Sequence, residues 1–206
     1  MTDTQVWIVD DDSSIRWVLE KTLVWIEQNR SRFTATHFIC VNLSGSSLND
    51  ERFVEDAFAM LSSHPLAASL LCLEVTESVA LHDLQNTGRF IDRAKSLGAK
   101  IALDDFGAGY SSFSYIQRLR VHKLKIDQSF VRHLGEDGSA QHIVRAIIGL
   151  AQSLDLESIA EGVETATQCE ALLSLGCNTG QGYYFSRPVP AAQLDAWMTE
   201  RRVTLV

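Results

Sequence analysis

The sequence predicts an α/β domain organised as a parallel (β/α) TIM-like barrel of about seven strands. Short apolar runs recur at intervals of roughly 20 to 36 residues, which is the repeat of successive strand–helix units. The intervals carry the apolar periodicity of helices. The first six runs end in a polar residue, and the seventh contains Gln181. The predicted strands are VWIVD, FICVN, LLCLE, KIALDD, HKLKID, ESIAE and NTGQGYYF.

Helices are expected between and after these strands, because apolar residues recur there at helical spacing. The expected ranges are 14–28, 51–62, 83–97, 139–154, 167–175 and 191–201. Gly98 and Gly176 suit the left-handed position just past a helix end. Candidate N-caps are Asp83, Ser139 and Thr165 or Thr167.

The bulk composition restricts the kind of partner. The chain has 206 residues, of which 46% are hydrophobic and 21% charged, as in a folded globular domain. A complete eightfold barrel typically needs about 250 residues, so the barrel is expected to be incomplete or modified. The formal charge of −8, without a Lys/Arg cluster, argues against a nucleic-acid polymer as partner. An anionic ligand would need bound cations.

No membrane partner is expected, because no run approaches the roughly 20 apolar residues needed to cross a bilayer and no signal-peptide pattern opens the chain. The cysteines lack C-x-x-C spacing, and two lie in predicted strands. They are expected to be small buried hydrophobes rather than zinc ligands or disulfides, as in a reducing cytoplasm. They are Cys40, Cys72, Cys169 and Cys177.

The polar residues at the strand ends should meet on one face of the barrel, where the C-terminal ends of parallel strands gather. Side chains two apart share a face, so an inward Glu74 brings Cys72 inward and leaves Leu73 outward. Small residues therefore lie beneath polar ones. The converging residues are Asn42, Glu74, Asp104 with Asp105, Lys125, Glu161 and Gln181.

Adjacent carboxylates such as Asp104 and Asp105 repel each other unless a cation neutralises them. Glu74 and Asn42 would complete an oxygen-rich shell suited to Mg²⁺ or Mn²⁺ rather than zinc. Two such ions about 3.5–4 Å apart can clamp a phosphodiester and activate water. The strand ends therefore predict a two-metal site.

Two further residues are candidates for the chemistry itself. Lys125 would stabilise the attacking water or the developing negative charge, and Glu161 would bind the second metal and help take the proton. Singly, each acid has the alternative of a helix cap or solvated turn, and Lys125 and Gln181 that of surface residues. Six polar positions in succession at the same strand end are harder to explain by caps.

Three acids and a glycine-rich segment accompany this set. Glu77, Asp127 and Glu164 fall out of phase with the inward residues, so they are expected to orient ligands or hold loops. In DDFGAGYSSF, Gly107 and Gly109 follow the acid pair and permit a sharp turn, which would couple cation binding to movement or to a partner subunit. An ordinary strand–helix connection is the alternative.

Several motifs occur together in a fixed order over roughly residues 16 to 195: VNLS, LEVTES, IALDDFGAGYSSF, LKIDQSFV, IAEGVET and GQGYYFSRPVP. In order and spacing they resemble the EAL-domain family of bacterial cyclic di-GMP phosphodiesterases. The resemblance implies hydrolysis of cyclic di-GMP to the linear dinucleotide pGpG, dependent on Mg²⁺ or Mn²⁺, in bacterial signalling.

The same resemblance implies a role for each matching position. Lys125 and Glu161 would position or deprotonate the attacking water, while Gln181 would line the guanine–phosphate site. Glu77 would hold the glycine loop. The implied metal ligands are Asn42, Glu74 and Asp104 for the first ion and Asp105 and Glu161 for the second.

The chain departs from the family at its start. The strand with the Glu-Ala-Leu motif, whose Glu binds metal, is absent, as is the nearby Arg that contacts substrate phosphate. Instead, VWIVDDDSSIRWVLEKTL resembles the first strand and helix of a response-regulator receiver domain of the nitrogen-regulator type. The expectation is a chimera, natural or engineered, with a receiver-like strand at 1–14, a shared splice helix at 15–28 and an EAL-derived part at 29–206, all within one domain at 1–206.

The receiver-like strand ends in Asp10, Asp11 and Asp12. These acids are possible surrogates for the absent Glu, because both strands are parallel and end on the same face. Correct ligation requires placement within about 0.5 Å, and solvated turn residues are the alternative. The later strand that carries the receiver's phosphorylated Asp is absent, so phosphotransfer is not expected.

The leading function is therefore a cyclic di-GMP phosphodiesterase domain with reduced or lost activity. The alternatives are a cyclic di-GMP binding or partner-interaction module without turnover, and a folding chimera without biological function. Exposed strand edges of an incomplete barrel favour a homodimer.

Overall fold

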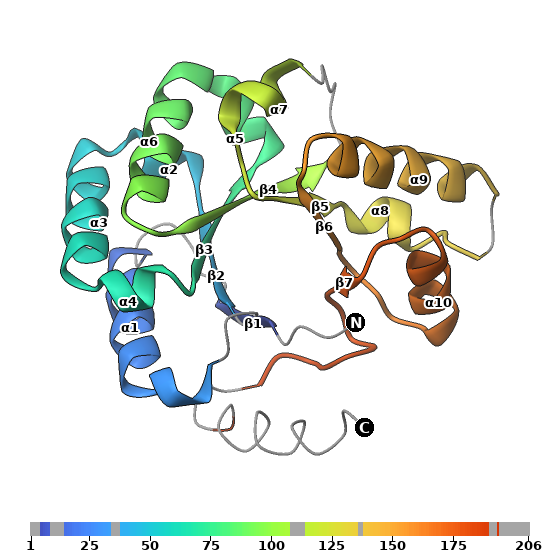
Figure 1. Ribbon diagram of the computed structural model, residues 1–206, viewed down its shortest axis with the longest axis horizontal. Coiled ribbons are helices and arrows are strands. Elements are labelled where there is room, and N and C mark those ends of the chain that lie inside the picture. The colour runs from blue at the N-terminus through green and yellow to red at the C-terminus, as the bar shows by residue number, and fades with distance from the viewer. Residues whose placement is uncertain are drawn as a thin grey trace.

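Figure 1 shows the computed structural model, in which parallel strands curl in the middle of the molecule and helices lie outside them. The structure describes residues 5–8, 15–33, 38–107, 114–135, 138–189 and 193. Seven strands follow one another in chain order, each parallel to the next. They are β1 (Gln5–Ile8), β2 (Phe38–Leu43), β3 (Leu71–Thr76), β4 (Lys100–Phe106), β5 (Lys123–Ile126), β6 (Glu157–Ala160) and β7 (Thr179–Gly180).

The strand order confirms the predicted TIM-like parallel arrangement. β1 and β7 stand at the two ends of the sheet, and no ladder joins them within the described residues. The sheet is therefore a curled, partly open barrel. Its C-terminal strand ends face one side, and that side receives the polar residues.

The longer helices confirm the predicted helix ranges to within one or two residues at each end. They are α1 (Ile15–Gln28), α3 (Glu51–Ser63), α6 (Leu84–Ser96), α9 (Gly138–Ser153) and α10 (Ala166–Ser174). Asp83 and Thr165 are the N-caps of α6 and α10, and Gly98 and Gly176 have φ of 98° and 90° just past helix ends. The N-cap predicted at Ser139 is wrong, because α9 already begins one residue earlier. The expected helix 191–201 lies outside the described residues except for residue 193.

Several short helices were not predicted, because four to six residues are too few to show periodicity. Some begin directly at a strand end, where the preceding side chain accepts a backbone N–H: Ser44 from Ser47 and Thr76 from Val79. The short helices are α2 (Gly45–Asn49), α4 (Pro65–Ala68), α5 (Glu77–His82), α7 (Ser114–Leu119), α8 (Gln128–Val131) and the 3₁₀ turn η1 (Arg30–Arg32).

The last strand is shorter than predicted. Residues 178–185 were expected to be extended, but only Thr179–Gly180 form β7 and a turn follows. The Val163 N–H donates to the Gln181 carbonyl at 2.9 Å, and the Tyr184 N–H donates to the Val163 carbonyl at 2.9 Å. A Cβ at Gly182 would lie 2.2 Å from the Val163 oxygen, so the chain turns where only glycine fits.

The predicted alternation of strand side chains is confirmed. An inner cluster consists of Phe38, Cys40, Cys72, Ala102 and Ile159, all buried. The outward residues of the same strands, among them Leu71, Leu73 and Ile101, pack in the larger core with the helices. The inner cluster is a small apolar layer beneath the polar strand ends.

Candidate active site

Lys125 is the centre of the charged residues at the C-terminal strand ends. It lies on β5 with 2% of its side chain exposed. Its Nζ is 2.6 Å from Glu74 Oε2, 2.9 Å from Asp104 Oδ2 and 2.6 Å from Glu161 Oε1. These carboxylates come from β3, β4 and the residue after β6, so one ammonium group joins the ends of four strands.

An irregularity in β4 turns two consecutive acids toward this centre. Leu103 pairs with Leu124 and Phe106 with Ile126, so β4 has one residue more than β5 between these pairs. Asp104 and Asp105 therefore both stand opposite the middle of β5, and Asp105 has a φ of 54°. A β-bulge of this kind re-aims a side chain. Asp105 was expected where the strand turns, but the strand continues to Phe106.

The geometry and chemistry of the acids fit divalent cations. One carboxylate oxygen each from Asp104, Asp105 and Glu161 lies within 4.8 Å of the others. Oε1 of Glu74 is buried and has no hydrogen-bond partner among the described residues. With Glu74, four carboxylates of the described residues face the single charge of Lys125. Hard oxygen donors of this type suit Mg²⁺ or Mn²⁺. Cations would satisfy both the unpaired oxygen and the surplus charge.

The electrostatics follow from burial and from this surplus. Burial raises the pKa of Glu74, partly offset by Lys125, and Asp104 raises it further. Burial also raises the pKa of Glu161 to about 8, although Lys125 opposes the shift. Burial would lower the pKa of Lys125, but the carboxylates of Glu74, Glu161 and Asp104 outweigh it and raise that pKa. Lys125 is therefore a cation near neutral pH, and Glu161 can exchange a proton there.

Two uncharged predicted residues flank the acids. Asn42 pairs in register with Glu74 on the neighbouring strand. Gln181 follows β7, and its N–H donates to the Ala160 carbonyl at 2.8 Å, which places it beside Glu161. Oε1 of Gln181 is buried without a hydrogen-bond partner among the described residues.

Glu77 holds the turn that follows the acid pair. It is 3% exposed at the start of α5, and its Oε2 accepts the Gly107 N–H at 3.0 Å. Its Oε1 accepts the hydroxyl of Tyr115 at 2.5 Å. The structure thus places Glu77 between the two ends of the segment that joins β4 to α7.

The other predicted residues are placed differently. Asp127 caps α8 by accepting the Ser129 N–H at 2.9 Å, and its proximity contributes to the raised pKa of Asp105, after burial and Asp104. Glu164 is exposed, and its backbone N–H donates to Gln168 Oε1 at 2.8 Å. The remaining candidates lie outside the described residues: Gly109, Asp10, Asp11 and Asp12.

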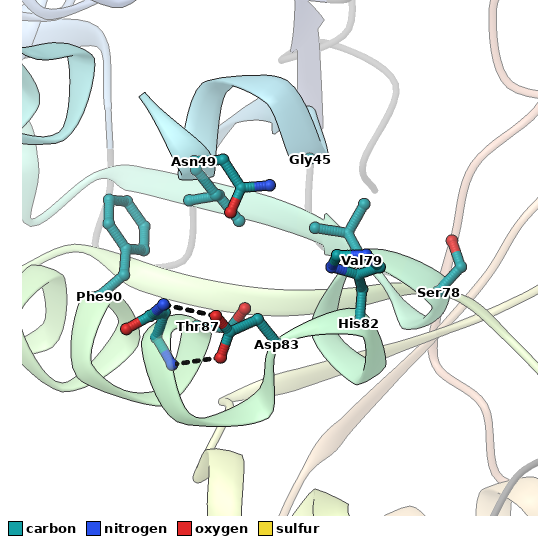
Figure 2. Close-up of a pocket in the computed structure, with 10 residues that line it drawn as sticks. Gly45, Asn49, Ser78, Val79, His82, Asp83, Thr87 and Phe90 are labelled. Atoms are coloured by element: carbon teal, nitrogen blue, oxygen red, sulfur yellow. Dashed lines mark hydrogen bonds between the residues drawn. The ribbon is translucent and has the colours of Figure 1, made fainter. Parts of the chain in front are cut away.

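A cavity of about 280 Å³ lies away from these acids, between α2, α5 and α6. Figure 2 shows Asn49, Val79, His82 and Phe90 around it, with Asp83 bonded to the start of α6. None of the predicted site residues that the structure describes lines it. The acid cluster rather than this cavity is the candidate active site.

The family model for the EAL domain matches residues 13–188. The chain belongs to the EAL-domain family. This confirms the part of the resemblance that rests on the motifs from VNLS onward. The receiver-like start and the chimera stay predictions.

Relatives of this EAL domain include a protein named as a phosphodiesterase. The chain is 37% identical over 182 residues to "Cyclic di-GMP phosphodiesterase PA2567" of Pseudomonas aeruginosa, covering 88% of this chain and 31% of that protein. The chain thus spans about a third of that relative. No helix within the described part of the domain combines the length and apolarity needed to cross a membrane.

Solved structures share the fold. The "PaMucR Phosphodiesterase, c-di-GMP complex" matches with a TM-score of 0.80 and 40% identity, covering 87% of this chain and 72% of that one. The EAL domain of Mycobacterium smegmatis DcpA matches with a TM-score of 0.81 and 34% identity, covering 90% and 83%. The curled barrel is therefore the architecture of EAL domains.

Two features of this EAL domain were missed from the sequence. One is Tyr115, whose only signal was a tyrosine in an apolar helix face, where a buried hydroxyl needs a partner. The other is Lys123, buried on β5. The alternation that turns Lys125 inward also turns Lys123 inward, so this residue could have been predicted.

Proposed function

We propose that this EAL domain is a phosphodiesterase that hydrolyses cyclic di-GMP to linear pGpG and depends on Mg²⁺ or Mn²⁺. The observation that carries the proposal is the cluster in which Lys125 meets Glu74, Asp104 and Glu161 at 2.6–2.9 Å on the EAL scaffold. Relatives named as cyclic di-GMP phosphodiesterases, and a neighbouring structure named as a cyclic di-GMP complex, support this substrate.

The oxygen donors divide into two overlapping sets. Asn42, Glu74 and Asp104 would hold one ion. Asp105 and Glu161 would hold a second, with oxygens close enough to Asp104 for that residue to serve both. When bound, the ions neutralise the phosphodiester and lower the pKa of a water. The surplus of carboxylates over Lys125 is the reason that cations are required.

The chain's own residues then divide the work. Lys125 remains protonated, so it cannot serve as a base and instead stabilises negative charge that develops on the phosphate. Glu161 would accept the proton of the attacking water once it is ionised, because the raised pKa of about 8 makes its carboxylate a stronger base. Gln181 would use its buried, unpaired Oε1 toward the guanine end of the substrate.

Activity in this 206-residue chain is expected to be lower than in an EAL domain that carries the Glu-Ala-Leu motif. The stretch VWIVDDDSS stands in its place, and the phosphate-binding Arg is also absent. Asp10, Asp11 or Asp12 would replace the Glu only with near-ideal placement. The same absence favours a second candidate function, namely binding of cyclic di-GMP without turnover. A receiver-like chimera, a homodimer and a cytoplasmic location remain predictions.

The test is turnover of cyclic di-GMP by the purified, monodisperse chain in Mg²⁺ and in Mn²⁺, read as pGpG by chromatography. Glu161→Ala should abolish product, whereas Glu170→Ala, which removes an exposed acid on α10, should not. Equal product from the parent and Glu161→Ala would contradict the proposal. If the parent makes no product, a cyclic di-GMP titration separates a binding module from a chain without this ligand.

A further inference from the structure

Glu77 uses its two carboxylate oxygens on two different segments. Oε2 accepts the Gly107 N–H at 3.0 Å, and Oε1 accepts the Tyr115 hydroxyl at 2.5 Å. Both Glu77 and Tyr115 are 3% exposed. A buried carboxylate is stabilised by charge-assisted hydrogen bonds, and two bonds from fixed donors also fix the plane of the group.

The first of these bonds ends next to the acid pair. Gly107 directly follows the last residue of β4 and has a φ of 95°. A Cβ there would lie 2.9 Å from Cε2 of Phe130, so the turn is closely packed. Asp105, two residues earlier, has a φ of 54°, which costs free energy for a residue other than glycine. Such a backbone persists only where its surroundings hold it.

We propose that Tyr115 is a positioning residue for the acid pair. Its hydroxyl orients the Glu77 carboxylate, Glu77 holds the N–H of Gly107, and this hold keeps Asp104 and Asp105 in the geometry that binds divalent cations. The inference rests on the proposed function for the identity of the site. It adds a residue on α7, Tyr115, which acts through its hydrogen bond to Glu77.

The experiment replaces Tyr115 by Phe, which keeps the ring and removes only the hydroxyl. Mn²⁺ binding is measured by calorimetry without substrate, and kcat and KM are measured against Mn²⁺ concentration. We expect Tyr115→Phe to weaken Mn²⁺ binding about tenfold, which is the lower end of the loss seen when direct hydrogen-bond partners of metal ligands are removed. At saturating Mn²⁺, KM for cyclic di-GMP should stay unchanged and kcat should largely recover. A merely structural role would leave the Mn²⁺ affinity of the folded protein unchanged.

Tyr184→Phe is the matched control, because it removes the hydroxyl of a tyrosine that is 45% exposed. Glu77→Gln is the second variant and should weaken Mn²⁺ binding by a similar factor, with no further loss in the double variant. Parent-like Mn²⁺ affinity in Tyr115→Phe, or in Glu77→Gln if the first does not fold, would overturn the inference. A parent that binds Mn²⁺ but makes no pGpG contradicts the proposed function alone, and a parent that binds no Mn²⁺ overturns both.

Discussion

Lys123 and Lys125 lie two residues apart on β5, and each is 2% exposed inside the barrel. Lys125 contacts Glu74, Asp104 and Glu161 at the C-terminal end. Lys123, nearer the N-terminal end, forms an ion pair with Glu157 and lies 3.9 Å from the centre of the Phe38 ring. The same residue type on one strand face therefore has two different surroundings.

The difference between these lysines separates the proposed cation-binding site from a structural ion pair. Among the described residues Lys123 meets one carboxylate, that of Glu157, whose other oxygen accepts the Thr179 hydroxyl at 3.0 Å. Both oxygens of this carboxylate therefore have a partner. The carboxylates around Lys125 outnumber it, and Glu74 Oε1 is left without a described partner. A buried surplus of one charge sign is costly unless a counter-ion arrives. The surplus of carboxylates, rather than burial alone, marks the Lys125 end as the proposed site.

The largest effect is expected when the ammonium group of Lys125 is removed from among its carboxylates. In EDTA, Lys125→Met should lower the free energy of unfolding by about 3 kcal/mol, because it leaves buried carboxylates without their partner. Urea denaturation measures the change. Lys21→Met, which replaces an exposed lysine on α1, is the control. A loss no larger than that of the control would show that the acids do not depend on Lys125.

An added divalent cation should stabilise the protein only through the carboxylates around Lys125. Mn²⁺ at about 100 times its dissociation constant should raise the free energy of unfolding by about 2.7 kcal/mol. Asp104→Asn should lose most of this gain, and Glu157→Gln should keep it. The comparison would fail if the two variants responded equally to Mn²⁺ in thermal unfolding.

The contrast also shows how much of the fold could be predicted. Alternation along strands predicted the interior cysteines, and helical periodicity predicted the long helices. β7 was overestimated because the apolar letters of NTGQGYYF look extended, whereas the approach of Gly182 to Val163 is a tertiary contact. Short helices such as α5 and α8 were missed because a cap and one turn leave no periodic pattern.

For the candidate site, the residues could be predicted but not all of their geometry. Strand-end position was enough to bring Glu74, Asp104, Lys125 and Glu161 together. The bulge that aims Asp105 was not predictable, because it depends on the register between β4 and β5. Tyr115 was missed because its partner lies 38 residues away in the sequence.

Removing the ion pair of Lys123 and Glu157 should lower the free energy of unfolding only slightly, and the loss should not depend on cations. Lys123→Met should cost about 1 kcal/mol, because the side chain of Glu157 is 38% exposed and water can solvate it. The double variant Lys123→Met with Glu157→Leu should recover much of this loss. Urea midpoints, measured with and without Mn²⁺, check both values. Loss of turnover in folded Lys123→Met would contradict a purely structural role.

The smallest expected effect is the dependence of stability on pH through His122, which lies just before β5. His122 accepts the Ile101 N–H on Nδ1 at 3.0 Å, which requires a neutral ring. Burial lowers the pKa of His122, and Lys95, Lys100 and Lys123 lower it further. The folded-state pKa thus lies below the unfolded value of about 6.5. The stabilisation is complete above that value and is lost as the pH falls through the folded-state pKa.

The acid site should respond in the opposite sense when cations are absent. Because burial raises the pKa of Glu161 to about 8, its protonation relieves repulsion as the pH falls through that value. His122→Asn keeps an acceptor for the Ile101 N–H. We expect the urea midpoint of this variant to fall less than that of the parent between pH 7 and pH 5 in EDTA, with no other change. His142→Asn, at an exposed position on α9, should behave as the parent. A parent-like pH profile in His122→Asn would show that the buried, lysine-rich surroundings of His122 do not make this end of the barrel acid-sensitive.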